Sequence, residues 1–374
     1  MAGRRIVVSG NCHVGAIATA VAAMLPDDHV EPIACYPEDP ATEAATGERL
    51  RHADAWVTLN DRSIHARILD GGEPPAEVVA LPNLRFFGYH PDIAHVGFRD
   101  GGVLVTGAVG PYNSALVLGG WRLGLTEEQI VGSFVPEVCD ALGYTTFWPA
   151  AVEELKRRVD RSDLGWGEVY LPLAQGEPFM LTDNHPRLNA LIHLARLAAG
   201  RLGADPDLVA FPWDQVLPDG LLATSEVWPV YPAVARQIGL RGGYVWRSAT
   251  HGLIDLPTFV RLSLETYRAV DPETLVAPAV LDPPDAEPPT LDLDPVVEVL
   301  DRHHSGRSLD PAPRAEPAGD RDAARAADPA GGTGPGGGVG PARDADPAGA
   351  GGQGPGRVRS VLAAWTGRRA AQAR

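Results

Sequence analysis

The chain has 374 residues, of which 44% are hydrophobic and 21% charged, and its formal net charge is −16. This length suggests one large or two ordinary domains with a substantial core. The acidic balance argues against non-specific nucleic-acid binding, because the phosphate backbone attracts basic surfaces. There is no apolar run of about 18 residues and no charged-then-apolar signal pattern at the N-terminus, so we expect a cytoplasmic protein.

The first segment predicts a strand, a tight turn and a helix in immediate succession. An apolar β-branched run over 6–8 leads into small residues and then Cys12, at or next to the first helical position. A thiol there feels the positive end of the helix dipole, which favours the thiolate. The geometry is typical of a nucleophile elbow, in which a sharp turn presents a side chain at the end of a strand. A small buried thiol that fills space under the turn is the alternative.

The first third of the chain continues as strands that alternate with helical stretches. This alternation predicts an α/β fold with a parallel sheet and flanking helices, in which ligands bind beyond the carboxyl ends of the strands. The turn that holds Cys12 would lie at that edge. The expected strands are 30–36, 55–59, 77–81 and 85–87, and the expected helices are 42–51 and 64–69.

The rest of the chain is mostly helical in pattern and ends in a segment of low complexity. Expected helices are 113–123, one opened by a capping box at Thr126–Gln129, 150–159, 188–202 and a short one at 296–300. Residues 305–356 are mainly Gly, Ala, Pro, Asp and Arg, a composition typical of a disordered linker.

Residues 357–374 regain a pattern, that of a basic amphipathic helix. Such a helix could contact a partner protein or an anionic membrane surface, or it could dock on its own acidic body or nowhere. The expected domains are therefore a catalytic domain over 1–304, the linker and this helix.

A second cluster with chemical potential is Thr182-Asp183-Asn184-His185-Pro186. Proline suits the first helical position, which places His185 near the N-cap, where a neutral imidazole able to accept a proton is favoured. A cysteine paired with such a histidine is the general arrangement for covalent acyl transfer, and Asp183 or Asn184 could orient the ring. Simple capping of a helix is the alternative.

Two further clusters follow strands, and each also has an ordinary explanation. His90 and Asp92 could form a base and its orienting group, a metal half-site or a substrate clamp, or they could only stabilise a turn. The glycines and hydroxyls of 107–114 precede a helix and could bind phosphate groups, or only form a loop and cap. No dinucleotide fingerprint or P-loop is present, and the three scattered cysteines and the isolated His303-His304 pair give no reason to expect a metal.

Four motifs in order resemble the WcbI-type family of capsular polysaccharide biosynthesis proteins, regarded as acetyltransferases that bind coenzyme A. They are a strand with Gly-Asn-Cys, Gly-Tyr-His-Pro-Asp-Ile, Gly-Pro-Tyr-Asn-Ser and Thr-x-Asn-His-Pro, within residues 4–270. The pattern is also similar to the SGNH hydrolases, with Cys12 in place of their serine. Two departures are notable: Asp183 and His185 are not spaced as Asp-x-x-His, and His13 stands where glutamine is expected.

The resemblance implies transfer of an acetyl group from acetyl-CoA to a sugar hydroxyl, with no metal. Cys12 would attack the thioester or lie beside the coenzyme A thiol, His185 would accept the proton, and the Asn11 side chain would stabilise the oxyanion. The expected catalytic and cofactor-binding residues are Cys12, His185, Asn11, His90 and Asp183, and Gly10, His13, Tyr112, Asn113 and Ser114. A cysteine-dependent esterase or deacetylase, or a non-catalytic protein that binds coenzyme A or a nucleotide sugar, remains an alternative.

Overall fold

The computed structural model describes residues 3–36, 39–59, 62–98, 105–218, 225–271, 274–276 and 292–309. Its centre is a parallel four-stranded sheet in the order β2-β1-β3-β4, which confirms the predicted fold class. The strands are β1 (Arg5–Gly10), β2 (His29–Ala34), β3 (Ala55–Thr58) and β4 (Glu77–Ala80).

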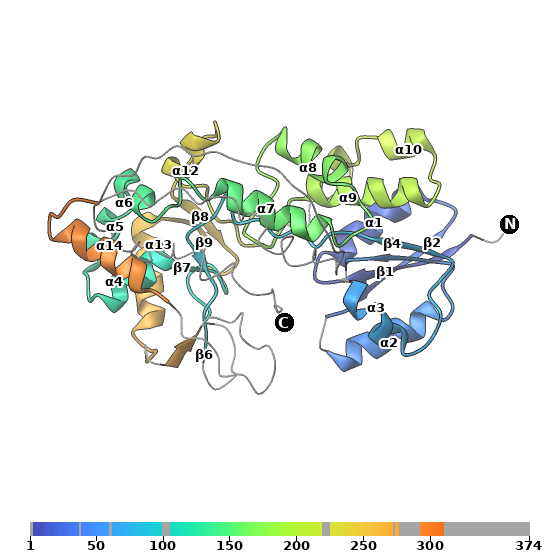
Figure 1. Cartoon of the computed structure of the whole chain (residues 1–374), viewed down its shortest axis with the longest axis horizontal. Coiled ribbons are helices and arrows are strands. Elements are labelled where there is room, and N and C mark those ends of the chain that lie inside the picture. The colour runs from blue at the N-terminus through green and yellow to red at the C-terminus, as the bar shows by residue number, and fades with distance from the viewer. Residues whose placement is uncertain are drawn as a thin grey trace, which may run out of the picture.

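Helices cover both faces of this sheet (Figure 1). On one face α1 (Val14–Met24) packs against α9 (Leu188–Arg201), and on the other α2 (Pro40–Leu50) packs against α3 (His65–Leu69). Successive side chains of a strand point to opposite faces, so Ile6 and Val8 join the core that includes α1 and α9, while Val7 joins the other core. The two central strands, β1 and β3, are therefore buried on both sides, as their apolar sequences require, whereas the edge strand β2 is partly exposed.

The strand order creates a natural binding position at the carboxyl end of β1. The chain passes from β1 through α1 to β2 on one side, and then crosses to β3 on the other side of β1. At such a switch point the loops after the two neighbouring strands diverge and leave a crevice. Cys12 lies two residues after β1 ends, at this edge of the sheet.

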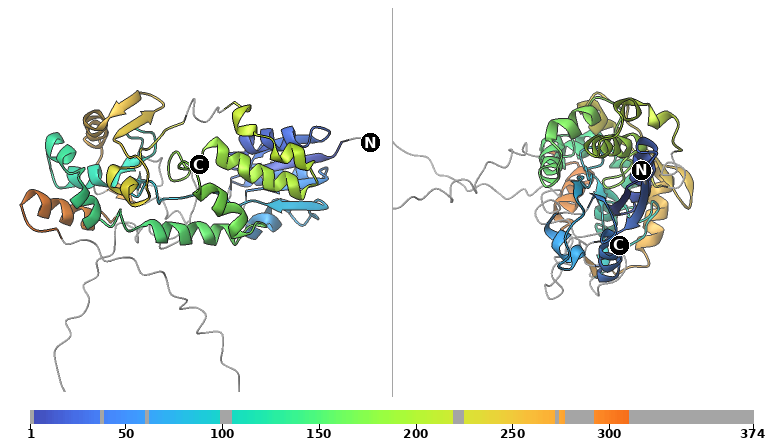
Figure 2. Two further views of the ribbon diagram at one scale, coloured as in Figure 1. Left: turned by 90° about the horizontal axis from the view of Figure 1, so that it is seen from above. Right: turned by 90° about the vertical axis from the view of Figure 1, so that its right-hand side faces the viewer.

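A second, mainly helical part lies at the other end of the elongated molecule (Figure 2), and α7 (Trp148–Val159) runs between the two (Figure 1). Short antiparallel pairs join β5 (Ile93–Ala94) to β7 (Asn113–Ser114), β6 (Gly97–Phe98) to β10 (Leu275–Val276), and β8 (Val245–Ser248) to β9 (Gly252–Asp255). The helices of this second part are α4 (Ala115–Arg122), α5 (Glu127–Gly132), α6 (Pro136–Ala141), α12 (Pro232–Gln237), α13 (Leu256–Tyr267) and α14 (Asp294–His304).

The remaining short elements lie beside α9 or α3. They are α8 (Trp166–Ala174), α10 (Pro206–Ala210), and the 3-10 turns η1 (Arg62–Ile64) and η2 (Trp213–Gln215).

The buried carboxylate of Asp92 connects several segments of this second part through hydrogen bonds. Asp92 accepts hydrogen bonds from the hydroxyls of Ser114 (2.5 Å), Tyr144 (2.9 Å) and Tyr231 (2.7 Å), and from the backbone N–H of Leu116 (3.0 Å). Burial nevertheless raises the pKa of Asp92 to about 6. Four donors from three separate segments of the chain converge on this carboxylate, which gives Asp92 a structural role.

Several of the predicted secondary-structure features are confirmed, and two are wrong. The capping box at Thr126 is present, and the predicted α9 and α14 regions are helical. Residues 85–87 are not a strand, because the Phe86 N–H donates to the Asp183 carbonyl (2.7 Å) instead of to a sheet. Pro186 is not the first helical residue, since α9 begins at Leu188.

The C-terminal predictions lie almost wholly outside the described residues. Only 305–309 of the expected linker are described, and the expected helix at 357–374 is not. Among the helices that the structure describes, none is both long and apolar enough to pass through a membrane.

Candidate active site

Cys12 lies in the turn between β1 and α1, and this turn is held by its neighbours. The Asn11 carboxamide oxygen accepts the His13 N–H (3.1 Å), and the Asn11 side-chain nitrogen donates to Asn83 (3.1 Å). Gly10 is required just before it, because a Cβ there would lie 2.6 Å from the Leu59 side chain. Of the three cysteines, Cys12 is exposed, whereas Cys35 and Cys139 are buried.

His185 is presented by a short hairpin-like loop that precedes α9. The Leu181 N–H donates to the His185 carbonyl (2.7 Å), and the Arg187 N–H donates to the Phe179 carbonyl (2.8 Å). His185 therefore lies outside the helix, two residues before its N-cap, Arg187. Its pKa is lowered, chiefly by burial, and the neutral imidazole that we predicted is present for a different reason.

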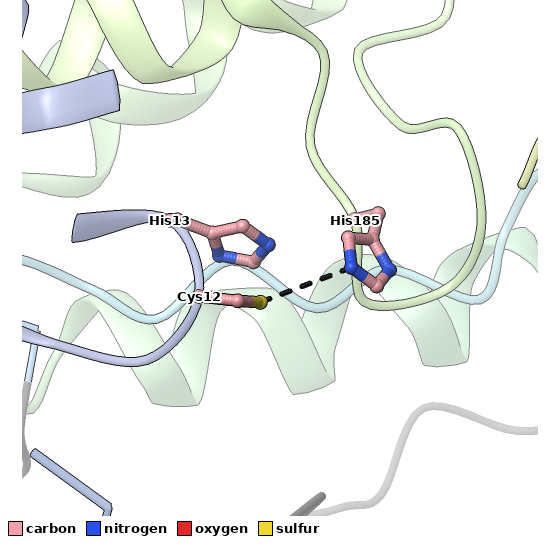
Figure 3. A group of neighbouring side chains, drawn as sticks. All are labelled: Cys12, His13 and His185. Atoms are coloured by element: carbon pink, nitrogen blue, oxygen red, sulfur yellow. Dashed lines mark hydrogen bonds between the residues drawn. The ribbon is translucent and has the colours of Figure 1, made fainter. Parts of the chain in front are cut away.

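The two side chains face one another across the site (Figure 3): Cys12 Sγ lies 3.8 Å from His185 Nε2. The other ring nitrogen, Nδ1, lies 2.5 Å from the Tyr112 hydroxyl and 3.1 Å from the Asn184 carboxamide oxygen. The Tyr112 hydroxyl donates its own proton to that Asn184 oxygen (2.7 Å). The network is satisfied when Nδ1 carries the proton and donates to the Tyr112 oxygen, which leaves the Nε2 lone pair aimed at the thiol.

Asp183 takes no direct part in orienting His185. It is fully buried and accepts hydrogen bonds from Arg85 Nε (3.0 Å) and His95 Nε2 (3.1 Å). Burial alone would raise the pKa of Asp183, but the charges and hydrogen bonds of His95 and Arg85 lower it well below its usual range. Of the two residues that could orient the ring, Asn184 makes the contact.

His13 is the third side chain of the cluster. Its ring stands edge-on to His185, with centroids 5.4 Å apart and planes at 83°. Both of its ring nitrogens are buried and have no hydrogen-bond partner among the described residues. Burial lowers the pKa of His13 to about 3, so its ring is neutral at pH 7.

The structure reverses one electrostatic expectation. Although Cys12 is exposed, surrounding protein atoms partly desolvate its sulfur, and this desolvation raises the pKa of the thiol. The helix dipole was expected to lower it, but Cys12 lies two residues before the start of α1. Because the favourable field falls off within the first turn, desolvation outweighs it.

The other predicted site residues lie inside the protein. Asn113 is buried, donates to the Val105 carbonyl (3.0 Å) and accepts from the Tyr267 hydroxyl (2.8 Å). Ser114 caps α4 and donates to the buried carboxylate of the second part of the molecule. His90 is buried as well, and burial lowers its pKa to about 3. The geometry favours structural roles for these three side chains.

Tyr112 has a contact that the sequence did not indicate. It was expected to contact the cofactor, and in the structure its hydroxyl also lies 2.5 Å from His185 Nδ1. Asn83 and His95 were not singled out at all, because no local motif connects them to Asn11 or Asp183. Only the folded chain brings these pairs together.

Comparison with known proteins agrees with this architecture. The family model of the polysaccharide biosynthesis enzyme WcbI matches residues 5–207, more than half of the chain. The chain therefore belongs to the WcbI family of polysaccharide biosynthesis enzymes. No curated protein sequence matches it.

A solved structure of WcbI has a similar fold. It is 16% identical, with a TM-score of 0.54, over 82% of this chain and 96% of the other. That structure is described as the native protein without a disulfide bond between coenzyme A and one of its cysteines.

Proposed function

We propose that this protein transfers an acetyl group from acetyl-CoA to a sugar hydroxyl during polysaccharide biosynthesis. The observation that carries the proposal is the pair formed by Cys12 Sγ and His185 Nε2, 3.8 Å apart, with the other imidazole nitrogen held by Tyr112. A nucleophile, a base and a group that orients the base are the elements of covalent acyl transfer. Family membership supports polysaccharide biosynthesis as the setting.

In the first half-reaction Cys12 attacks the thioester carbonyl. Its thiol proton passes to His185 Nε2 as the new S–C bond forms, and the bond from carbon to the coenzyme A sulfur then breaks. His185 returns the proton to the departing thiolate, which leaves as free coenzyme A. The Cys12 N–H and the second N–H of the Asn11 amide are the donors for the oxyanion, and losing one such donor typically costs ~2.7–4 kcal/mol.

In the second half-reaction the sugar hydroxyl attacks the acetylated cysteine. His185 Nε2 accepts the hydroxyl proton, the carbon–sulfur bond breaks, and the Cys12 sulfur regains a proton from the imidazolium. The acetyl ester of the sugar is released. Each half-reaction therefore uses the same base in the same position.

Coenzyme A as the donor is supported by the cysteine chemistry of the structural neighbour. That protein is described in terms of a disulfide bond between coenzyme A and a cysteine, which requires a cysteine that the coenzyme A thiol can reach. In this chain Cys12 is the exposed cysteine, at the carboxyl edge of the parallel sheet.

The test is mass spectrometry of the protein after incubation with acetyl-CoA. We expect one added acetyl group, mapped to Cys12, which a sugar acceptor then discharges; Cys12→Ala should not become acetylated. If Cys12→Ala consumes acetyl-CoA at the wild-type rate, the proposal is refuted. Cleavage of acetyl esters that needs no acceptor would instead identify the hydrolase alternative.

A further inference from the structure

His13 is buried beside Cys12, and the proposed acetyl transfer gives its ring no role. The side chain is 1% exposed, and neither ring nitrogen has a partner among the described residues. A buried polar atom without a hydrogen bond lowers the stability of the folded protein. Such an atom is therefore often the binding position of a ligand, a water or an ion. The ring faces the site from the same turn as Cys12 (Figure 3).

The ligand atoms of Cys12, His13 and His185 all lie within 4.8 Å of one another. A zinc-type ion binds thiolate sulfur at ~2.3 Å and imidazole nitrogen at ~2.0–2.1 Å, so a tetrahedral angle places the two ligand atoms ~3.6 Å apart. The observed separation of Cys12 Sγ and His185 Nε2 is 3.8 Å. The separations that involve His13 reach as much as 4.8 Å, so an ion at the centre of this group would draw the His13 ring closer to the other two ligands.

We propose that Cys12, His13 and His185 form a binding site for a divalent transition-metal ion of the zinc type. Three protein ligands leave the fourth position open, and the exposed Cys12 provides a route for entry. The inference goes beyond the proposed function and does not rest on it.

The surroundings of His185 fit this role. A metal-bound histidine normally donates its second ring N–H to a fixed acceptor, which sets the ring orientation. Here Nδ1 lies against the Tyr112 hydroxyl and the Asn184 oxygen while Nε2 faces the other ligands. Sulfur and imidazole ligands select zinc-type ions and disfavour magnesium and calcium, which prefer oxygen.

Binding has two chemical consequences. The Cys12 thiol must release its proton to solvent as the sulfur–metal bond forms, so one proton leaves for each ion bound. The sulfur lone pair is then shared with the ion, so the bound thiolate is less available for attack on a carbon electrophile. An ion at this site should therefore protect Cys12 from alkylation and slow its acetylation.

The experiment uses the full chain, first treated with a chelator and then titrated with Co²⁺. We expect a thiolate-to-cobalt charge-transfer absorption, visible bands of tetrahedral intensity, displacement by Zn²⁺, and release of one proton for each ion in calorimetry with two buffers. His13→Gln should weaken Co²⁺ binding by more than the ~10–100-fold that loss of an outer-shell partner costs. The control His251→Gln, an exposed histidine outside the cluster, should bind Co²⁺ as the wild type does.

Each opposite outcome overturns the proposal. These outcomes are a wild-type protein without the charge-transfer band, binding that releases no proton, or binding unchanged in His13→Gln. Acetylation of Cys12 is measured separately in the presence of chelator. A failure to bind Co²⁺ therefore leaves the proposed acetyl transfer intact. A failure of Cys12 to become acetylated likewise leaves the proposed metal site intact.

Discussion

Tyr112→Phe tests whether the phenol holds the base in place. The substitution keeps the ring, which is 2% exposed, and removes only the hydroxyl. That hydroxyl takes part in two contacts, one with His185 Nδ1 at 2.5 Å and one with the Asn184 carboxamide oxygen at 2.7 Å. Without it, the imidazole can rotate or change tautomer, and its Nε2 lone pair no longer points steadily at the thiol.

The size of the effect follows from the bonds lost. Each buried hydrogen bond contributes about 1 kcal/mol net, so the two together bias the ring by ~2 kcal/mol, which corresponds to ~30-fold in rate. The Asn184 oxygen lies 3.1 Å from Nδ1 and can accept its proton directly in the variant, which recovers part of the loss. We therefore expect acetylation of Cys12 to slow about 10- to 30-fold.

The assay is single-turnover acetylation of Cys12 by acetyl-CoA, followed by mass spectrometry over a range of acetyl-CoA concentrations. The maximal rate should fall while the concentration for half-maximal rate changes little, because the hydroxyl contacts the base. Tyr267→Phe is the matched control, since it loses a similar buried bond to an asparagine oxygen (2.8 Å) and should keep the wild-type rate. A variant of Tyr112 with an unchanged maximal rate and weaker acetyl-CoA binding would refute the orienting role and support a cofactor contact.

Three further predictions concern the proposed base His185, the Cys12 thiol and the carboxylate of Asp183. His185→Ala should abolish turnover without lowering thermal stability, and surviving activity would show that the residue only shapes its loop. Cys12 should alkylate faster than the buried Cys35 and Cys139, with a rate–pH midpoint above the ~8.5 of a free thiol, because desolvation raises its pKa. Asp183→Asn should cost about 3–5 kcal/mol in denaturant unfolding, since it breaks a buried ion pair. The folded pKa of Asp183 is lowered, so its contribution is complete above the unfolded pKa of ~3.9 and is lost as pH falls towards the folded value. A wild-type stability that stays flat below pH ~3.9 would contradict this.

The sheet was predictable because its signals are local. Short segments at 6–8, 55–58 and 77–80, each containing β-branched residues, alternate with helical patterns, and burial keeps these segments mostly apolar. The position of Cys12 followed from the same signals, since a turn after the first strand must lie at the carboxyl edge of a parallel sheet.

The surroundings of each candidate side chain were not predictable in the same way. Asp183 and His185 are two residues apart, yet one side chain turns to Arg85 and His95 and the other to Cys12. The opposite directions of these two side chains depend on the backbone of the loop. Backbone hydrogen bonds between Phe179 and Arg187 and between Leu181 and His185 close this loop. Neither propensity nor spacing encodes that closure, so the Asn-His pair looked like an ordinary helix cap.

The pKa directions in the site also determine how the thiol can react. Desolvation raises the pKa of Cys12 and lowers that of His185, so both shifts disfavour a resting thiolate–imidazolium pair. The contact to Nδ1 comes from the phenol and carboxamide of Tyr112 and Asn184, and among the described residues no carboxylate makes a hydrogen bond to the ring. A charged pair formed before attack would therefore stand without a direct counter-ion, whereas a proton that moves as the sulfur–carbon bond forms avoids that state. We therefore expect Cys12 to react through general-base catalysis in the proposed transfer, and a solvent deuterium isotope effect near unity on Cys12 acetylation would contradict this reasoning.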